Sequence, residues 1–509
     1  FAAGARCGLV EKDITSLIGR QVLSLVIPED RTCLEAVLGR LDGCGRADPT
    51  AVRLRGIRGE ELVARIGGCS LPGSGGLRHL AVLMTPAASQ PSVITVDEML
   101  SGLEDRLAAA QARGEDRELT LISVEGMRDI AARVSPAKID EIRKTFEAYL
   151  RAVSDGGDGA TRLEEGRYAV LHGSGLNENE ISQTLGGLVS SVLPGVQPKI
   201  MQIGFGGAGS SPRDTARALA YVLQSFATDG PDALQTFKDG ETRDFMSDIA
   251  GRVAELRQMI DERRFSLVYQ PIVDVETSVL HHVEALARFR EATSPQEIVM
   301  FAERVGMIPE FDLAVFHSAA VAIADAKREG RRPPPVAVNI SAFSLARPGF
   351  SAKLLALAAA EGIEPDLMLV ELTETASVID LRPVANAIEE LRSYGFPTCL
   401  DDVGSGTTSL MSINTFAVDY VKIDGALLKG ALQSDRDMAI FESTVAICHR
   451  LGKKIVGEHV ETTDHRRLLS QHGIKFAQGW LYGRPAHDLK TLSGRPPAAK
   501  HTGKALRQA

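Results

Sequence analysis

A set of carboxylates, one amide and one lysine in the second half of the chain has the residue types of a two-metal hydrolytic site. Each lies in, closes or directly follows a short apolar run; the set is Glu284, Asn339, Glu371, Asp401, Asp402, Lys422 and Glu458. Carboxylates brought together in this number would repel one another unless cations were present. Because the set contains no Cys or His, it implies hard divalent ions such as Mg²⁺ or Mn²⁺. Two such ions can generate hydroxide and stabilise the leaving oxygen of a phosphodiester.

Short apolar runs separated by helical stretches would position these side chains. Such runs are typical of strands buried on both faces of a parallel sheet. The eight runs are Leu267–Gln270, Val283–Leu286, Val336–Ile340, Met368–Glu371, Thr398–Asp401, Tyr420–Ile423, Lys454–Glu458 and Phe476–Gln478. Eight strands with intervening helices predict a TIM-type (β/α)8 barrel, whose strand ends meet on the face where active sites form.

The order of motifs along this region resembles that of EAL-type cyclic-di-GMP phosphodiesterases. The residues that carry the resemblance are Tyr269-Gln270-Pro271-Ile272, Glu284-Ala285-Leu286-Ala287-Arg288, Val338-Asn339-Ile340-Ser341, Glu371-Leu372-Thr373-Glu374, Asp401-Asp402, Val421-Lys422-Ile423-Asp424, Glu458-His459-Val460-Glu461-Thr462 and Gln478-Gly479. One such motif alone would mean little, but the ordered series is specific. It implies metal-dependent hydrolysis of cyclic-di-GMP to linear pGpG.

The resemblance also implies a role for each matching residue. One metal ion would be bound by Glu284, Asn339, Glu371 and Asp401. The second would be shared through Asp401 and completed by Asp402 and Glu458. Three residues would have catalytic roles: Glu458, Lys422 and Glu461. Lys422 would orient the attacking water or neutralise charge in the transition state, and Glu461 would support the site from outside the metal ligands. Candidates for holding the dinucleotide are Gln270, Arg288 and Gln478. Glu374 would position the loop that follows Asp402.

The chain departs from the family pattern at two places. The family loop DDFGTGYSSL is here Asp401-Asp402-Val403-Gly404-Ser405-Gly406-Thr407-Thr408-Ser409-Leu410, so Val403 and Thr407 replace two aromatics. His459 stands where the family has glycine, so it would crowd the metal site or hold a strained backbone angle costing about 1–3 kcal/mol. These departures leave open a receptor that binds cyclic-di-GMP without cleaving it, and a scaffold that has lost nucleotide binding. His281 and His282, outside the motifs, are expected to be solvated.

Residues 1–85 resemble a PAS domain that lacks its first strands. Leu17-Ile18-Gly19-Arg20 and Leu25-Val26-Ile27-Pro28-Glu29-Asp30-Arg31 carry this resemblance, and alternating residues near 51–56 and 77–84 predict antiparallel strands. Both a sensory domain and a dimerising adaptor are compatible with these residues.

Residues 92–232 resemble a degenerate GGDEF-type diguanylate cyclase domain. A helix is expected to begin at Thr95-Val96-Asp97-Glu98, and a strand near 118–125. Ser123 stands where the family has its first metal-binding aspartate, and the hairpin Arg162–Tyr168 lacks the acidic motif. A spacer and dimerisation role is therefore favoured over an active cyclase. Residues 243–264 are predicted to form a linking helix, 265–490 the EAL-type barrel, and 491–509 a polar tail.

Composition limits the classes of partner. The 509 residues carry a formal net charge of -9, which argues against DNA or RNA binding driven by phosphate contacts. No apolar run reaches the ~20 residues that a membrane span needs. The six cysteines show no CxxC pair, so a reducing compartment is expected. We expect a cytoplasmic homodimer that binds cyclic-di-GMP, whether or not an anchor precedes Phe1.

Overall fold

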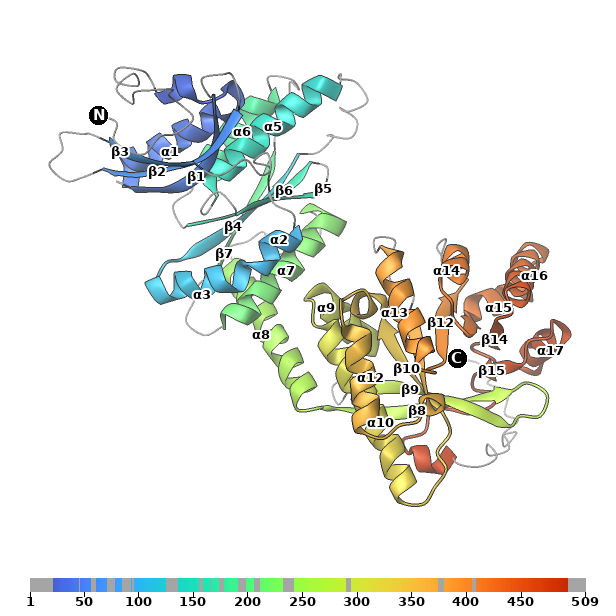
Figure 1. Ribbon diagram of the computed structural model, residues 1–509. Helices are drawn as coiled ribbons and strands as arrows, with labels where there is room; N and C mark the ends of the chain where they lie inside the picture. The colour runs from blue at the N-terminus through green and yellow to red at the C-terminus, as the bar shows by residue number, and fades with distance from the viewer. Residues whose placement is uncertain are drawn as a thin grey trace, which may run out of the picture. The chain divides into compact units, whose positions relative to one another are not determined.

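The computed structural model describes most of the chain between residues 22 and 492 (Figure 1). The residues outside this description are 1–21, 45, 56–60, 71–77, 85–92, 94–95, 125–135, 155–158, 165, 174–177, 191–197, 206–210, 232–241, 290–293, 374–379, 405–408 and 493–509. The chain divides into two compact units, Phe1–Ala254 and Glu255–Ala509, and each is treated by itself. Among the described residues, no helix combines the length and apolar character needed to cross a membrane.

The first part of the N-terminal unit is a three-stranded antiparallel sheet with one long helix. Its elements are η2 (Val22–Leu25), η3 (Pro28–Asp30), α1 (Arg31–Cys44), β1 (Arg46–Arg55), β2 (Glu61–Ser70) and β3 (Arg78–Met84). The sheet order is β1-β2-β3, which confirms the antiparallel strands expected here. The helix contributes Leu34 and Leu41 to a core that also contains Val52, Leu54 and Ile66 of the sheet.

The second part of this unit is a four-stranded antiparallel sheet with helices. Its elements are α2 (Val96–Ser101), α3 (Leu103–Arg113), β4 (Arg117–Ser123), α5 (Pro136–Val153), β5 (Ala160–Glu164), β6 (Arg167–Gly173), α6 (Glu178–Ser190), β7 (Lys199–Phe205) and α7 (Pro212–Asp229). The sheet order is β5-β6-β4-β7. The helix expected to begin at Thr95-Val96-Asp97-Glu98 is confirmed by α2, and a break at Gly102 separates it from α3. Ser123 ends β4 and is buried.

Helix α8 (Thr242–Asp261) follows, close to the helix that its spacing predicts. Its apolar residues recur every three or four positions, and those that are buried include Met246, Ile249, Val253, Leu256 and Ile260. This period places them on one face of the helix.

The C-terminal unit is a closed eight-stranded barrel with helices on its outside (Figure 1). Its strands are β8 (Phe265–Asp274), β9 (Leu280–Phe289), β10 (Val336–Ser341), β11 (Met368–Thr373), β12 (Thr398–Val403), β13 (Tyr420–Ile423), β14 (Lys454–Gly457) and β15 (Phe476–Gln478). Its helices are α9 (Pro295–Arg304), α10 (Ile308–Arg328), α11 (Ala342–Leu345), α12 (Phe350–Ala360), η6 (Pro365–Leu367), α13 (Leu381–Ser393), α14 (Ser409–Thr415), α15 (Gly425–Ala431), α16 (Asp435–Arg450), α17 (Thr463–Gln471) and η7 (Leu489–Leu492). All eight predicted runs lie in or directly against these strands.

The direction of β8 corrects the expected all-parallel barrel. The strand order is β10-β11-β12-β13-β14-β15-β8-β9, and β8 runs antiparallel to both of its neighbours. The connection from β8 to β9 is a tight turn in which the Asp274 carboxylate accepts hydrogen bonds from the backbone N–H groups of Glu276 and Thr277. A parallel connection needs a crossover of a dozen or more residues, so this turn imposes the antiparallel direction.

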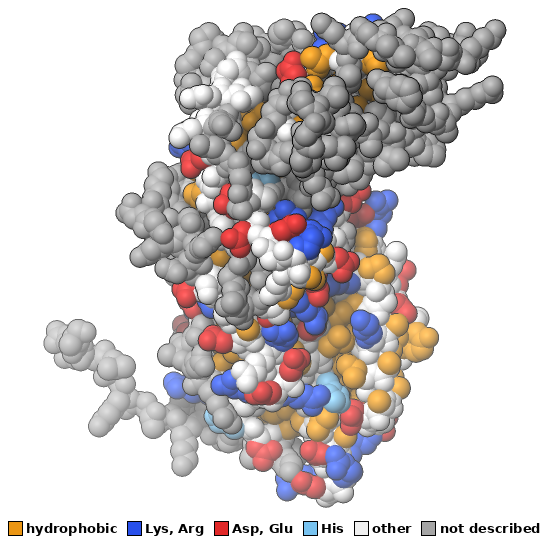
Figure 2. Space-filling view, turned by 90° about the vertical axis from the view of Figure 1, so that its left-hand side faces the viewer, with side chains coloured by type: hydrophobic (Ala, Val, Ile, Leu, Met, Phe, Trp, Pro, Cys, Tyr) orange, Lys and Arg blue, Asp and Glu red, His pale blue; other side chains and the backbone are white. Residues whose placement is uncertain are grey.

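The barrel interior contains one layer of mostly apolar side chains. The layer consists of Ile272, Ala337, Leu369, Cys399, Tyr420, Val456 and Phe476, one from each strand except β9. On the face of the molecule shown in Figure 2, acidic and basic side chains of the described residues are interspersed.

Candidate active site

The predicted site residues form the next layer of the barrel. Side chains two positions apart on a strand point to the same face. The residues two positions beyond layer members on the parallel strands are Asn339, Glu371, Asp401, Lys422, Glu458 and Gln478. On the antiparallel strand β8, the corresponding residue lies two positions before Ile272 and is Gln270, which is opposite Glu284 of β9 in the register. A polar layer thus lies directly on an apolar one.

Lys422 is the centre of this polar layer. Its Nζ lies 3.1 Å from Glu284 Oε2, 3.0 Å from Asp401 Oδ1 and 2.9 Å from Glu458 Oε1. It also forms an ion pair with Glu371. The lysine and all four carboxylates are buried. One ammonium therefore faces four carboxylates in a region from which water is largely excluded.

Two side-chain amides orient Glu284. Asn339 Nδ2 donates to Glu284 Oε1 at 2.7 Å, and Gln478 Nε2 donates to Glu284 Oε2 at 2.7 Å. Because each amide contacts Glu284 through its N–H₂ group, the amide oxygen takes no part in this contact. The Asn339 Oδ1 and Gln478 Oε1 atoms are both buried without a hydrogen-bond partner.

A second acidic group adjoins the first at the mouth of the barrel. One oxygen each from Glu284, Glu371 and Asp401 lie within 4.8 Å of one another, and the same holds for Asp401, Asp402 and Glu458. Asp401 belongs to both groups. Asp402 has a φ of 54°, in the left-handed region, and its backbone N–H donates to Asp401 Oδ1 at 2.9 Å. Asp402 itself is exposed, so the second group is open to solvent on one side.

The electrostatics of the layer follow from burial and from the excess of negative charge. Burial raises the pKa of Glu458 to about 8 against the opposing effect of Lys422, and burial with the Asp401 charge raises the pKa of Asp402 to about 6. Burial also raises the pKa of Glu371 well above its ordinary value. Burial lowers the pKa of Lys422, but the four carboxylates outweigh it and leave that pKa well above its ordinary value. The lysine is therefore charged and the carboxylates compete for protons.

Glu284 differs from its neighbours. Burial raises its pKa, but Lys422 and the hydrogen bonds from Gln478 and Asn339 outweigh burial, so the pKa of Glu284 is lowered. It is the carboxylate of the layer most readily kept ionised.

The donor set fits hard divalent cations. It consists of carboxylate and amide oxygens, the ligands that Mg²⁺, Mn²⁺ and Ca²⁺ prefer. The buried, unpartnered Asn339 Oδ1 is an acceptor that a cation would satisfy, and leaving such an atom unpaired is costly. A cation would also relieve the repulsion that raises the carboxylate pKa values. Two ion sites sharing Asp401 are compatible with the two acidic groups.

Comparison with known proteins identifies the barrel. The family model described as the EAL domain matches residues 253–485. The chain contains an EAL domain. This match confirms the EAL domain expected from the ordered motifs.

Curated relatives match different parts of the chain. The cyclic di-GMP phosphodiesterase NbdA of Pseudomonas aeruginosa is 30% identical over 235 residues, which cover 45% of this chain and 30% of NbdA. An uncharacterized signaling protein of Caulobacter vibrioides is 24% identical over an alignment that covers 100% of this chain and 66% of that protein. A solved structure described as the PaMucR phosphodiesterase in a c-di-GMP complex is 28% identical, covers 47% of this chain and 98% of its own, and has a TM-score of 0.43. The chain spans less than two thirds of the length of both curated relatives.

Three other predicted residues lie within the part of the chain that the structure describes. Gln270 is half-buried and faces Glu284 across the β8–β9 pair. Arg288, near the end of β9, is half-buried and its Nη1 donates to the carbonyl of Ala287 at 2.9 Å. Glu461 is 38% exposed and lies 3.8 Å from Lys429 Nζ, outside the polar layer. Glu374 lies outside the described residues. Their roles stay predictions.

Of the two effects expected of His459, the structure shows the strained backbone angle. The residue has a φ of 50°, so it holds the left-handed angle that a glycine would adopt without strain. Its exposed side chain lies against Gly425 at the start of α15, where a Cβ on that glycine would come within 2.6 Å of His459 Cγ. Of the other family departure, Val403 is fully buried and Thr407 lies outside the described residues.

The expectation that both histidines before Glu284 are solvated is wrong for His282. It is only 4% exposed, contacts Tyr420 and lies with its Nδ1 2.7 Å from His281 Nδ1. Burial lowers the pKa of His282 well below its ordinary value, so it is neutral. His282 lies two positions before Glu284 on β9 and therefore occupies the layer below it. That period-two spacing was visible in the sequence.

A buried acid that the motifs did not indicate holds the turn after Asn339. Asp312 of α10 accepts hydrogen bonds from the Ser341 backbone N–H at 2.9 Å and from Ser344 Oγ at 2.6 Å. Burial raises the pKa of Asp312 to about 7. The sequence does not indicate this contact, because both partners of Asp312 are neutral and lie 29 and 32 residues further along the chain.

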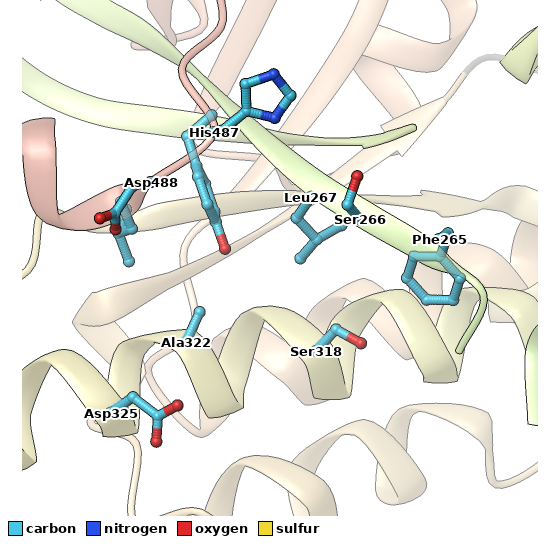
Figure 3. A pocket seen from close by; sticks show the side chains of 10 residues that line it. Phe265, Ser266, Leu267, Ser318, Ala322, Asp325, His487 and Asp488 are labelled. Carbon is cyan, nitrogen blue, oxygen red and sulfur yellow. The ribbon is translucent and has the colours of Figure 1, made fainter. Parts of the chain in front are cut away.

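A separate cavity of about 360 Å³ lies on the outer wall of the barrel (Figure 3). It is lined by side chains of β8, of α10 and of the segment after β15, including Leu267, Ser318, Asp325 and Asp488. None of the carboxylates that contact Lys422 lines it. This cavity is therefore distinct from the polar layer inside the barrel.

Proposed function

We propose that this chain hydrolyses cyclic-di-GMP to linear pGpG with two divalent cations, Mg²⁺ or Mn²⁺. The observation that carries the proposal is the buried set of four carboxylates around Lys422, with two acidic groups that share Asp401. The EAL domain match and the activity in the name of NbdA support the choice of substrate. Structural frameworks alone do not fix activity, but this site has the required chemistry.

The residues that would hold the cations follow from the two acidic groups. Glu284, Asn339, Glu371 and Asp401 would hold one, and Asp401, Asp402 and Glu458 the other. Two bound cations supply hydroxide and neutralise charge on the reacting phosphodiester.

Lys422 and the carboxylates have complementary roles in this reaction. Lys422 stays protonated and contacts every buried carboxylate of the layer, so it keeps a positive charge where the phosphate's negative charge would increase. Glu458, with a pKa of about 8, can hold or release a proton near neutral pH. Gln270, Arg288 and Gln478 would position the dinucleotide, and Arg288 can form paired hydrogen bonds to phosphate. Glu461 and Glu374 would support the site from its edge.

Turnover by matched variants tests this proposal. We expect Glu284→Gln, which keeps the shape of the side chain, to abolish formation of linear product measured by chromatography. The control Glu389→Gln changes an exposed glutamate on α13 and should leave turnover unchanged. Equal turnover in Glu284→Gln and the parent chain would contradict the proposal. Binding of cyclic-di-GMP by the parent chain without turnover would instead assign it the receptor function.

We also infer that the N-terminal domains regulate the barrel in a cytoplasmic homodimer. Inside the N-terminal unit, Asp30 accepts hydrogen bonds from the Arg53 guanidinium and lies 3.7 Å from Arg151 of α5. Asp30 thus connects the PAS-like sheet with the GGDEF-like domain. Regulation through these domains predicts that Asp30→Ala changes turnover of the full chain without a change in the barrel itself. Unchanged turnover across a stable, folded variant would contradict this inference.

A further inference from the structure

Trp480 is the chain's single tryptophan, and it lies exposed on the loop that leaves the polar layer. Its side chain is 60% exposed, whereas Tyr482, two residues later, is only 7% exposed. The loop begins at Gln478, whose amide donates to Glu284 Oε2. Tryptophan is enriched among the residues that dominate binding energy, so its place beside the site makes it a candidate ligand contact.

Hydrogen bonds hold the backbone of the loop on both sides of Trp480. Val460 N–H donates to the Gln478 carbonyl at 3.0 Å, and Leu481 N–H donates to the Val460 carbonyl at 3.0 Å. Gly479 packs so closely that a Cβ there would lie 2.6 Å from the Val460 carbonyl carbon. Since Glu458 lies two residues before Val460, both ends of the loop are anchored beside the carboxylates. Trp480 is therefore exposed on an ordered turn.

One face of the indole carries a cation. The Arg484 guanidinium carbon lies 4.7 Å from the centroid of the Trp480 ring. A cation over one face leaves the other open for a flat aromatic ligand. The guanidinium can in addition donate paired hydrogen bonds to a phosphate or to the O6 and N7 atoms of guanine. A ligand that combines a purine with a phosphate matches both groups.

We propose that Trp480 and Arg484 form a stacking platform for one guanine base of the substrate. This inference rests on the proposed function, since it concerns how the cyclic dinucleotide is held. It adds a base contact to Gln270 and Gln478 inside the barrel. Trp480 is then the residue that favours a nucleotide over a phosphodiester without a base.

Two substrates separate base stacking from catalysis. The full chain and its Trp480→Ala and Trp480→Phe variants are assayed with cyclic-di-GMP and with bis(p-nitrophenyl) phosphate, which has no nucleobase. Loss of one stacked base corresponds to roughly 5- to 150-fold in affinity. We expect Trp480→Ala to lower kcat/KM for cyclic-di-GMP within that range, mainly through KM, while its rate with bis(p-nitrophenyl) phosphate is unchanged. Trp480→Phe keeps an aromatic face and should restore most of the loss.

The control is Tyr394→Ala. Tyr394 is 62% exposed and caps the end of α13 that precedes β12, at the opposite end of the barrel from the carboxylates. We expect this variant to match the parent chain with both substrates. Equal losses in Trp480→Ala and Tyr394→Ala would contradict a specific contact.

Fluorescence gives a second readout that a structural role would not change. Because Trp480 is the single tryptophan, its emission reports this position alone. We expect cyclic-di-GMP, titrated in Ca²⁺, to quench it, and pGpG to quench it more weakly. Turnover by the parent chain with no quenching and no effect of Trp480→Ala would overturn the stacking platform alone. Absence of both binding and turnover in the parent chain would overturn the proposed function and this inference together.

Discussion

Replacing Lys422 by methionine tests how the polar layer is held together. Methionine keeps a long apolar side chain but removes the ammonium that contacts Glu284, Asp401 and Glu458 within 3.1 Å and also pairs with Glu371. Removing one partner of a buried ion pair costs about 3–5 kcal/mol, because the remaining charge is left uncompensated. We expect Lys422→Met to lose free energy of unfolding in this range at pH 8 in EDTA.

The loss should depend on pH and on metal. Without Lys422 the raised pKa values of Glu371, Asp401 and Glu458 rise further, and Glu284 loses the charge that lowers its own pKa, so the folded state binds more protons than the unfolded state. Stability of the variant therefore falls as pH rises, and the loss should be smaller at pH 5 than at pH 8. Divalent cations that bind only the folded barrel should restore stability by RT ln(1 + [metal]/Kd).

Urea unfolding followed by Trp480 fluorescence provides the assay, because the single tryptophan lies in the barrel. The control Lys327→Met removes a half-buried surface lysine that pairs with the exposed Glu364 and should cost no more than about 1 kcal/mol. A Lys422→Met variant as stable as the parent chain in EDTA at pH 8 would contradict the role of Lys422 in stabilising the polar layer. So would an equal loss at pH 5 and pH 8.

Three further predictions concern Asp312, the contact between Gly425 and His459, and metal binding by Asp402 and Glu458. Asp312→Ala should cost about 2–4 kcal/mol by urea unfolding, because it leaves two buried donors without an acceptor. Asp312→Asn should cost less and should remove a fall in stability between about pH 4 and 7, since the folded pKa of about 7 exceeds the ordinary value of 3.8; a parent chain with no such fall would contradict this. Gly425→Ala should be destabilising and His459→Gly should offset it, and additive effects in a double-mutant cycle would show that the two residues do not interact. Mn²⁺ affinity by calorimetry should rise between about pH 6 and 8, because Asp402 and Glu458 must release protons whose pKa values are about 6 and 8; a flat profile would exclude them as ligands.

The sequence predicted the strands and the polar layer because both follow from local patterns. Short apolar runs ended by Glu371, Asp401 and Lys422 require only that strands alternate their faces and that parallel strands align their ends. The same rule applied backwards from Glu284 places His282 inside the barrel, although its polarity suggested a solvated position.

Other features depend on tertiary contacts that the local pattern does not contain. The direction of β8 depends on the Asp274 turn, whose few residues are too short for a crossover. Asp312 lies on α10, whose sequence has the ordinary apolar spacing of an amphipathic helix. Its partner Ser341 becomes a neighbour only when α10 packs on β10. The contact of His459 with Gly425 likewise joins the segment after β14 to the start of α15.

Metal-dependent hydrolysis is tested most directly by product formation during a Mn²⁺ titration of the full chain after treatment with EDTA. We expect no linear pGpG from cyclic-di-GMP without metal, and turnover that rises to saturation as Mn²⁺ is added. Product formed at the same rate without metal would contradict the assigned role of the carboxylates. No product at any Mn²⁺ or Mg²⁺ concentration would contradict the hydrolytic function.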